Sequence, residues 1–397
     1  MKRVIFEEEH EIFRESARRF FEAEVKPNRD KYREAGVVDR ELYLKAGEQG
    51  FLIMQADEKY GGVGIDDMRF EQILAEEGVR HGDSGFFYGL HNRLVAPYIL
   101  GLGTEEQKQR LLPGCCRGEI ILAIAMTEPG TGSDVAAIKT HAEDQGDHFV
   151  LNGQKTYISN GILSDVVIVA ARTGAPGSRS LGLFLVERGM EGFSRGRNLK
   201  KMGLKSQDTA ELFFDNVRIP KENVLGDPTK GFYYLMQFLV DERLMGAIGY
   251  LSAAQAAFDL TMDYITERKL FGQTVADFQV NRFKMADMRT EIDVAQIALD
   301  HCVMQFNAGQ LTADEVARIK LYGSELEGRV VDECVQLHGG AGYMDEYHIS
   351  RMYTDARISR IYAGSSEVMR EIIARSLGLD PRKKQAVEAK QAKAATG

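Results

Sequence analysis

Residues 125–134 gather the groups that an anionic ligand needs. The segment reads Ala-Met-Thr-Glu-Pro-Gly-Thr-Gly-Ser-Asp and follows an apolar run. A loop of this composition exposes backbone N–H groups and hydroxyls, which are the donors that a pyrophosphate or the edge of a flavin ring requires. Taken alone, an ordinary Pro-Gly turn is an equally good interpretation. No GxGxxG motif follows a predicted strand, so a dinucleotide would not be held in the Rossmann manner.

Glu242 lies in the segment Val-Asp-Glu-Arg-Leu at residues 240–244, at the expected start of a helix. Spacing alone favours its interpretation as an acid in the first turn of that helix, where it meets the helix macrodipole.

Other catalytic motifs are missing from the sequence. It contains no HExxH, no Cys/His cluster with metal-ligand spacing and no GxSxG, which argues against metallohydrolases and serine hydrolases. We predict no metal site. The four cysteines, Cys115, Cys116, Cys302 and Cys334, lack CxxC spacing, so a reducing compartment is expected and the pair Cys115–Cys116 is interpreted as packing.

Composition sets the class of protein. A chain of 397 residues with 44% hydrophobic content can bury a large core, and its net charge of -9 disfavours nucleic acid and anionic membranes as partners. Its apolar runs are shorter than the roughly 18 residues of a membrane span. The acidic N-terminus predicts a cytoplasmic protein, although a trimmed mitochondrial matrix enzyme would look the same. The basic stretch from Arg195 to Lys205 suits a solvated face better than a site for a phosphate group or an acidic partner protein.

The elements that position these residues fall into an α+β multidomain order. We predict an N-terminal helical domain at residues 1–117, a β domain at 118–231, a helical bundle at 232–380 and a disordered tail at 381–397. The first helix should bury Ile12, Phe13, Ala17, Phe20 and Phe21. In the bundle, apolar residues recur at helical spacing at Met285, Met288, Ile292, Ala295, Leu299, Cys302 and Phe306. Asn152-Gly153 predicts a hairpin turn, and further strands are expected at 166–171, 182–186 and 210–214.

Several motifs, in order, resemble the signatures of the acyl-CoA dehydrogenase family. They are the loop at 125–134, Gly-Gln-Lys-Thr-Tyr-Ile-Ser-Asn-Gly at 153–161, Glu-Arg-Lys-Leu-Phe-Gly at 267–272, Gln-Leu-His-Gly-Gly-Ala-Gly-Tyr at 336–343 and Ile-Tyr-Ala-Gly-Ser-Ser-Glu at 361–367. The resemblance extends from about residue 5 to 380. It implies the family's α, β, α fold, an FAD cofactor and a homotetramer built as a dimer of dimers.

The resemblance also implies which residues contact FAD. Tyr157 stands where Trp is more frequent in the family, and Ser159 stands for Thr. The first group of expected FAD contacts is Ile124, Ala125, Met126, Thr127, Ser133, Tyr157, Ile158, Ser159, Ser365 and Glu367. Another group would reach the FAD of a neighbouring subunit: Arg268, Phe271, Phe278, Gln279, Gln336, Leu337, His338, Gly339 and Gly340.

The base is the point at which this sequence departs from many family members. Ala363 occupies the position where they carry a glutamate, whereas Glu242 matches the alternative base of the long-chain and isovaleryl branches. The N–H group of Ala363 would still contact the thioester carbonyl. The residues expected near substrate are Ser133, Asp241, Arg243, Tyr362, Ala363 and Gly364, with Gly85, Gly89 and Leu90 as candidates for the floor of the acyl pocket.

The activity implied by the resemblance is FAD-dependent α,β-dehydrogenation of an acyl-CoA to the trans-2-enoyl-CoA in fatty-acid β-oxidation. Electrons would pass to an electron-transfer flavoprotein. Residues 202–214 look most similar to the long-chain branch. Two alternatives remain open: an acyl-CoA oxidase or flavin monooxygenase on the same scaffold, and a non-catalytic acyl-CoA-binding protein.

Overall fold

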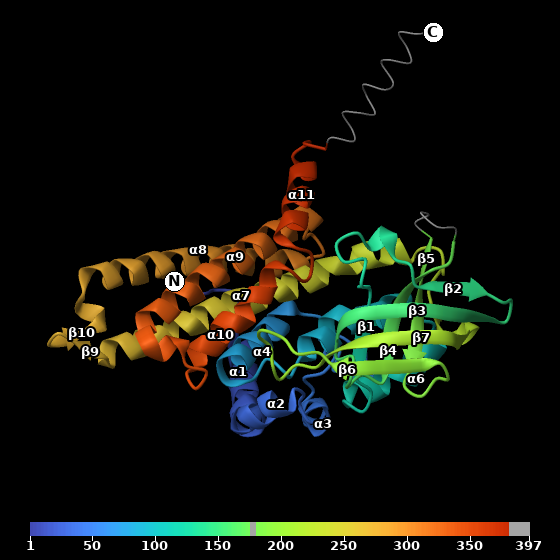
Figure 1. Cartoon of the computed structure of the whole chain (residues 1–397), viewed down its shortest axis with the longest axis horizontal. Coiled ribbons are helices and arrows are strands. Elements are labelled where there is room, and N and C mark those ends of the chain that lie inside the picture. Colours follow the sequence, from blue (N-terminus) through green and yellow to red (C-terminus); the bar gives the residue numbers. More distant parts are fainter. Residues whose placement is uncertain (175–179, 381–397) are drawn as a thin grey trace, which may run out of the picture.

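The computed structural model describes residues 1–174 and 180–380, so the tail predicted for 381–397 lies outside the described residues. Helices fill the first part of the chain and form a layer below the rest in Figure 1. Their bounds are α1 Glu8–Phe20, α2 Arg29–Ala35, α3 Glu41–Glu48, α4 Met68–His81, α5 Ala96–Leu102 and α6 Glu105–Cys116, with a π-helical turn, Leu90–Val95, before α5. The predicted face of α1 is correct except at Ile12, which is 67% exposed.

The middle of the chain folds into one sheet. Its order is β6-β7-β3-β2-β4-β5-β8, and β1 pairs in parallel with β4. The strands are β1 Leu122–Ala125, β2 His141–Asp144, β3 His148–Ser159, β4 Val166–Arg172, β5 Leu181–Glu187, β6 Phe193–Asn198, β7 Thr209–Pro220 and β8 Val224–Leu225. Alternate residues of β4 enter two different cores: Val166 and Ile168 pack toward α5 and α6, while Val167 and Val169 pack within the sheet domain. Both faces of β4 are therefore buried.

The predicted hairpin at Asn152-Gly153 is wrong. β3 runs unbroken through these residues, and the register against β7 shifts between Leu151 and Gly153. A Cβ at Gly153 would lie 2.6 Å from the Thr140 hydroxyl oxygen, so close packing and a bulge explain this glycine. The hairpin instead connects β2 to β3, where the backbone N–H of Gln145 donates to the carbonyl of His148 at 2.9 Å.

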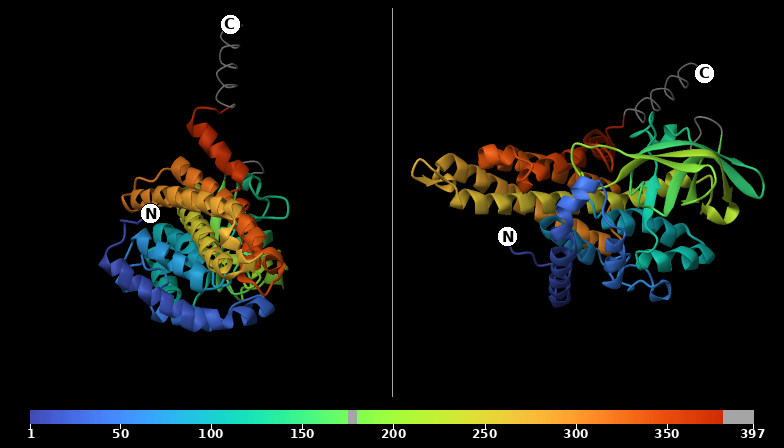
Figure 2. Two further views of the ribbon diagram at one scale, coloured as in Figure 1. Left: turned by 90° about the vertical axis from the view of Figure 1, so that its left-hand side faces the viewer. Right: turned by 60° about the horizontal axis from the view of Figure 1, so that its bottom comes forward.

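Long helices complete the chain. They are α7 Gly231–Glu267, α8 Gln279–Asn307 and α9 Ala313–His338, followed by the shorter α10 His348–Ala356 and α11 Ser366–Ser376. The face predicted for α8 is confirmed, because Met285, Met288, Ile292, Ala295, Leu299 and Cys302 are all buried and Phe306 packs against the same core, partly buried. A small hairpin, β9 Lys269–Leu270 and β10 Gln273–Thr274, turns the chain between α7 and α8. It projects at the end opposite the sheet (Figures 1 and 2).

With 37 residues, α7 is the longest of the described helices. At 1.5 Å per residue it is roughly 55 Å long. Its first turns pack against the sheet domain and its last turns reach the projecting hairpin, as Figure 2 shows from two sides. None of the described helices is long and apolar enough to cross a membrane.

Candidate active site

A buried ion pair holds the loop after β1, residues 126–134, in place. Lys155 Nζ lies 2.8 Å from Glu128 Oε1 and donates to the Met126 carbonyl at 3.0 Å, and neither side chain is more than 6% exposed. The Glu128 carboxylate also accepts from the backbone N–H groups of Lys139 and Thr140 at 2.7 and 2.9 Å. Burial opposes ionisation of Glu128, but the Lys155 charge and these hydrogen bonds hold its pKa below its ordinary value. This ion pair fixes the loop backbone.

Other residues of the same loop are open to solvent. Ser133 is exposed, and a Cβ at Gly130 or Gly132 would meet nothing within 4 Å. The N–H of Thr156 donates to the Thr127 carbonyl at 3.0 Å, so the loop lies directly beside β3. There β3 bulges, and Tyr157 takes a left-handed φ of 60° with 70% of its surface exposed. An exposed ring beside unhindered backbone donors fits an isoalloxazine and its pyrophosphate.

Glu242 lies inside α7, about three turns after Gly231. The interpretation as a first-turn acid is therefore wrong, because the helix begins earlier than residues 240–244 suggested. The side chain is half-buried, and burial raises its pKa against the opposing charges of Arg243 and Lys320. A carboxylate with a raised pKa is a stronger base than an exposed one.

Three tyrosines lie close enough to Glu242 to interact with its charge: Tyr98, Tyr250 and Tyr362. The Tyr98 ring of α5 packs against Phe238 at a tilted angle, with 4.5 Å between ring centroids. Tyr98 also shares a buried apolar cluster with Leu122 of β1, against which Met126 packs. The rings of Tyr250 and Tyr362 lie 6.1 Å apart between centroids, and Tyr362 directly precedes Ala363. Glu242 therefore interacts with a tyrosine packed near β1 and with the segment that carries Ala363.

Ala363 has a left-handed backbone with φ 55°, which a residue with a Cβ rarely adopts. Lys320 Nζ donates to the carbonyls of Ser359 and Gly364 at 2.9 and 2.7 Å, on either side of it. A Cβ at Gly364 would lie 3.8 Å from Arg243 Nη2, so Arg243 reaches the same segment. The structure therefore brings together Glu242, Arg243, Tyr362, Ala363 and Gly364.

Local contacts describe four further predicted residues. Asp241 is half-buried, and burial raises its pKa to about 6 against the charge of Arg93. Ser365 caps α11 by accepting from the N–H of Val368 at 3.4 Å, and Glu367 is exposed in the first turn of that helix. Gly85 is a packing residue, because a Cβ there would lie 2.4 Å from the Ser206 carbonyl oxygen.

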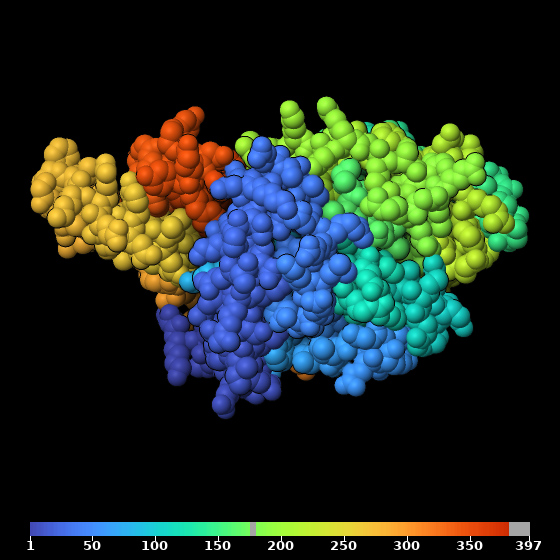
Figure 3. Space-filling view, turned by 90° about the horizontal axis from the view of Figure 1, so that it is seen from below, coloured from blue at the N-terminus to red at the C-terminus, as the bar shows by residue number. Residues whose placement is uncertain are grey.

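A second group of predicted residues lies at the far end of α7. Arg268 ends this helix and Phe271, 94% exposed, lies in the hairpin beyond it. His338 ends α9 beside them, because its ring stacks on Tyr264 at 4.2 Å and its carbonyl accepts from the Tyr264 hydroxyl. Since 26 helical residues separate Glu242 from Arg268, the two groups lie roughly 40 Å apart. Figure 3 shows the hairpin projecting from one end of the molecule.

Two residues of the basic stretch serve the fold. Arg195 donates to the carbonyls of Gly161 and Ser164 at 2.8 and 2.9 Å, and Lys201 donates to the carbonyl of Gln207. Arg197, Lys200 and Lys205 are exposed. The stretch is therefore partly structural, which its charge alone did not indicate.

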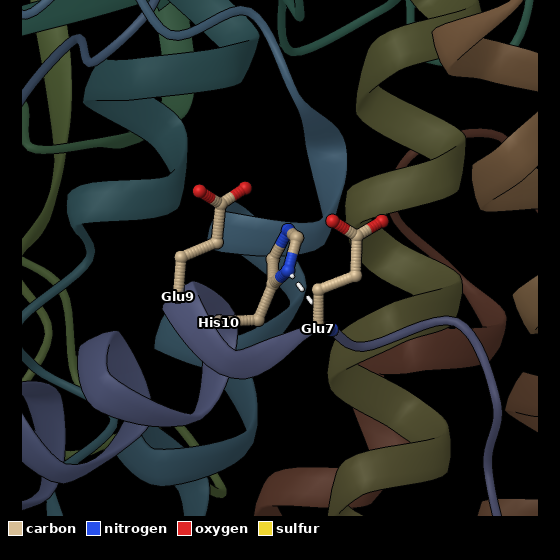
Figure 4. A group of neighbouring side chains, drawn as sticks. All are labelled: Glu7, Glu9 and His10. Carbon is tan, nitrogen blue, oxygen red and sulfur yellow. Dashed lines mark hydrogen bonds between the residues drawn. The ribbon is translucent and has the colours of Figure 1, made fainter.

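Glu7, Glu9 and His10 gather at the start of α1 (Figure 4). The N–H of Glu7 donates to His10 Nδ1 at 3.2 Å in a capping box, and Nε2 lies 3.5 Å from Asp67 Oδ2. One ring nitrogen thus caps the helix, and the other faces Asp67, the residue that caps α4. Helix capping accounts for this group, and we assign it no metal.

Family models match nearly the whole chain. The N-terminal, middle and C-terminal domains of acyl-CoA dehydrogenase match residues 7–119, 123–217 and 229–378. The mitochondrial long-chain specific acyl-CoA dehydrogenase of Mus musculus is 46% identical over 95% of this chain and 88% of its own length. The acyl-CoA dehydrogenase of Geobacillus kaustophilus is also 46% identical, with a TM-score of 0.92 over 94% of this chain and 98% of its own.

A solved relative also bears on the cofactor. A glutaryl-CoA dehydrogenase from Mycobacterium smegmatis, solved in complex with FADH2, is 28% identical with a TM-score of 0.88 and covers 94% of this chain and 95% of its own. The open loop beside Tyr157 and the matched residues 123–217 agree with such a cofactor. This chain therefore belongs to the acyl-CoA dehydrogenase family, whose members are FAD-dependent oxidoreductases.

Proposed function

We propose that this protein dehydrogenates long-chain acyl-CoA thioesters between the α and β carbons, giving the trans-2-enoyl-CoA in fatty-acid β-oxidation. The observation that carries the proposal is Glu242, a half-buried carboxylate whose charge acts on Tyr98, packed near β1, and on Tyr362, next to Ala363. When bound, FAD supplies the acceptor for the hydride from the β carbon.

The proposal gives each residue of the site a defined role. Glu242 removes the α-proton, and its raised pKa favours that transfer. The N–H of Ala363 donates to the thioester carbonyl, where negative charge develops as the α-proton leaves. Asp241, Arg243, Tyr362 and Gly364 line the same region, with Ser133 on the flavin side. The hydroxyls of Thr127 and Ser159 and the ring of Tyr157 hold the flavin.

We also propose a homotetramer in which each FAD is shared by two subunits. Arg268 lies roughly 40 Å from Glu242 along one helix, farther than a single FAD can span. The exposed Phe271 and the open backbone of Gly339 and Gly340, which have nothing within 4 Å of a Cβ position, suit contact with another subunit. Phe278, Gln279 and Gln336 belong to this surface, whereas the Leu337 side chain is buried in the core of the bundle beneath it.

One experiment separates this function from its rivals. Palmitoyl-CoA is added anaerobically to the FAD-loaded protein, and the flavin absorbance is followed. Bleaching is expected, and a non-catalytic acyl-CoA-binding protein would show none. Slow reoxidation in air with fast reoxidation by an electron-transfer flavoprotein supports the dehydrogenase. Rapid reoxidation in air with peroxide release would identify an oxidase, and cell fractionation would test the proposed cytoplasmic location.

The base has its own test. Glu242→Gln keeps the size of the side chain but removes its basicity, so the rate of flavin reduction should fall by at least roughly 10²-fold. Asp263→Asn, an exposed carboxylate on the same helix, is the matched control and should leave the rate unchanged. Ala363→Glu in the Glu242→Gln background should recover part of the rate. A wild-type rate in Glu242→Gln would remove Glu242 from the mechanism.

A further inference from the structure

Lys320 of α9 is a fully buried lysine whose hydrogen bonds go to carbonyl groups. Its side chain is 0% exposed, and Nζ donates to the Ser359 and Gly364 carbonyls at 2.9 and 2.7 Å. Lys155, the other deeply buried lysine of the site, has Glu128 as an ion-pair partner. No ion pair between Lys320 and a carboxylate is found among the described residues. Burying an ammonium group is costly, so its retention here calls for a role.

The two carbonyls flank the strained part of the loop. Residues 359–364 include Ala363, whose left-handed backbone is strained for a residue with a Cβ. One end of this segment is fixed by Ser359 Oγ, which donates to the Ala356 carbonyl at 2.7 Å. The ammonium joins that end to Gly364. Without it, little would oppose relaxation of Ala363 to an ordinary conformation.

The same ammonium faces the proposed base. Lys320 and Arg243 are the cations that act on Glu242, and both oppose the effect of its burial. Burial and the neighbouring Arg243 lower the pKa of Lys320 itself to about 8, so it is charged at neutral pH. The titratable groups that act on this pair come from α5, α7, α9 and the loop before α11: Tyr98, Glu242, Arg243, Tyr250, Glu325, Glu327 and Tyr362.

We propose that Lys320 is a positioning residue of the active site, which aims the Ala363 N–H at the thioester carbonyl and keeps Glu242 ionised. This inference rests on the proposed function. It gives one side chain two effects that can be measured separately. The first is geometric and acts through the loop, and the second is electrostatic and acts through space.

The test uses the full-length, FAD-loaded protein with Lys320→Met, which keeps the length of the side chain and removes its charge and donors. Anaerobic flavin reduction by palmitoyl-CoA is measured against pH. The midpoint of the acid limb should rise by about one pH unit because Glu242 loses a favourable charge. The plateau rate should fall roughly 10-fold or more because the carbonyl donor is displaced. Lys284→Met, which breaks a more exposed pair with Glu333, should change neither quantity.

A second substitution separates the two effects. Glycine adopts positive φ without strain, so Ala363→Gly added to Lys320→Met should recover part of the plateau rate. The midpoint should stay shifted, because the charge is still missing. Hydrogen exchange of the amides in 361–365 should be faster in Lys320→Met than in wild type, which reports the loop independently of turnover.

Failure of the Lys320 inference can be distinguished from failure of the base assignment. A wild-type plateau and midpoint in Lys320→Met would overturn the inference, even if Glu242→Gln is inactive. If Glu242→Gln retains full activity, the proposed function fails at its base, whatever Lys320→Met does. Lys320→Gln, a neutral donor, serves as the second variant. Failure of both Lys320 variants to load FAD would also overturn the inference, since Lys320 would then be needed for folding rather than positioning.

Discussion

The separation of Glu242 from Arg268 along α7 predicts complementation between two inactive variants. If each FAD is held by the loop of one subunit and by Arg268 of another, each active site takes its Glu242 and its Arg268 from different subunits. Glu242→Gln and Arg268→Ala on separate chains then affect contributions from different subunits. A mixed dimer then has one site with both defects and one site with neither. The roughly 40 Å between the two residues excludes a contact of both with one FAD inside a single chain.

The expected magnitudes follow from the contacts. Glu242→Gln alone should retain roughly 1% of the rate of flavin reduction. Arg268→Ala removes one charge-assisted contact worth about 1.5–3 kcal/mol, which raises the FAD dissociation constant roughly 10- to 100-fold. Random pairing gives about half mixed dimers, each with one intact site of its two, so the mixture should show about one quarter of wild-type activity per subunit.

The assay co-expresses the two variants with different affinity tags and isolates the mixed oligomer by sequential purification. Activity and FAD content are compared with the same variants purified separately and mixed after assembly, which should show no recovery. A double variant carrying both substitutions on one chain, paired with wild type, is the second control. Activity of the mixed oligomer no higher than the mean of its parents would refute the sharing of FAD between subunits.

Three further predictions concern buried groups. Lys155→Met should lower both FAD retention and the melting temperature, because removing one partner of a buried ion pair costs about 3–5 kcal/mol, whereas Arg218→Met at the exposed pair with Asp147 should do neither. Burial raises the pKa of Glu327 to about 8, above its unfolded value of about 4.3, so the folded state binds more protons in this window and stability falls as pH rises through it. The melting temperature of Glu327→Gln relative to wild type should therefore rise between about pH 5 and 8, and a constant difference would contradict this. All four cysteines are buried, and burial raises the pKa of Cys116 to about 11, so thiol reagents should modify the native protein far more slowly than the unfolded protein.

Periodicity predicted the elements well where one face of an element is buried. The stripe from Met285 to Cys302 faces the core of the bundle because that helix contacts its neighbours on one side only. The turn predicted from Asn152-Gly153 was wrong because turn propensity is local, whereas Gly153 is required by the close approach of Thr140, the residue before β2. The prediction that Ile12 is buried was wrong because a single apolar residue can lie beside a buried stripe without joining it.

The two buried lysines were also missed, although the sequence holds a signal for each. Lys320 lies between Val316 and Ser324 on the buried face of α9, and Glu327 follows it by seven residues on the same face. Charged residues at core positions of a periodic helix indicate a buried polar network. Lys155 faces inward from β3 just before a bulge. The partners of these lysines cannot be found in the sequence, because Ser359, Gly364 and Glu128 come from other elements.

Placing the base on α7 changes what residue 363 has to do. Its side chain carries no proton in the proposed mechanism, so only its backbone N–H is required, and any residue that holds a left-handed φ could supply it. Glycine would adopt that backbone without strain but would also leave it readily. Alanine narrows the conformations of the loop at a cost of about 1–2 kcal/mol, which the hydrogen bonds of Lys320 can offset. The donor and the base are therefore held by different elements, α9 through Lys320 and α7, and either can be altered while the other stays in place.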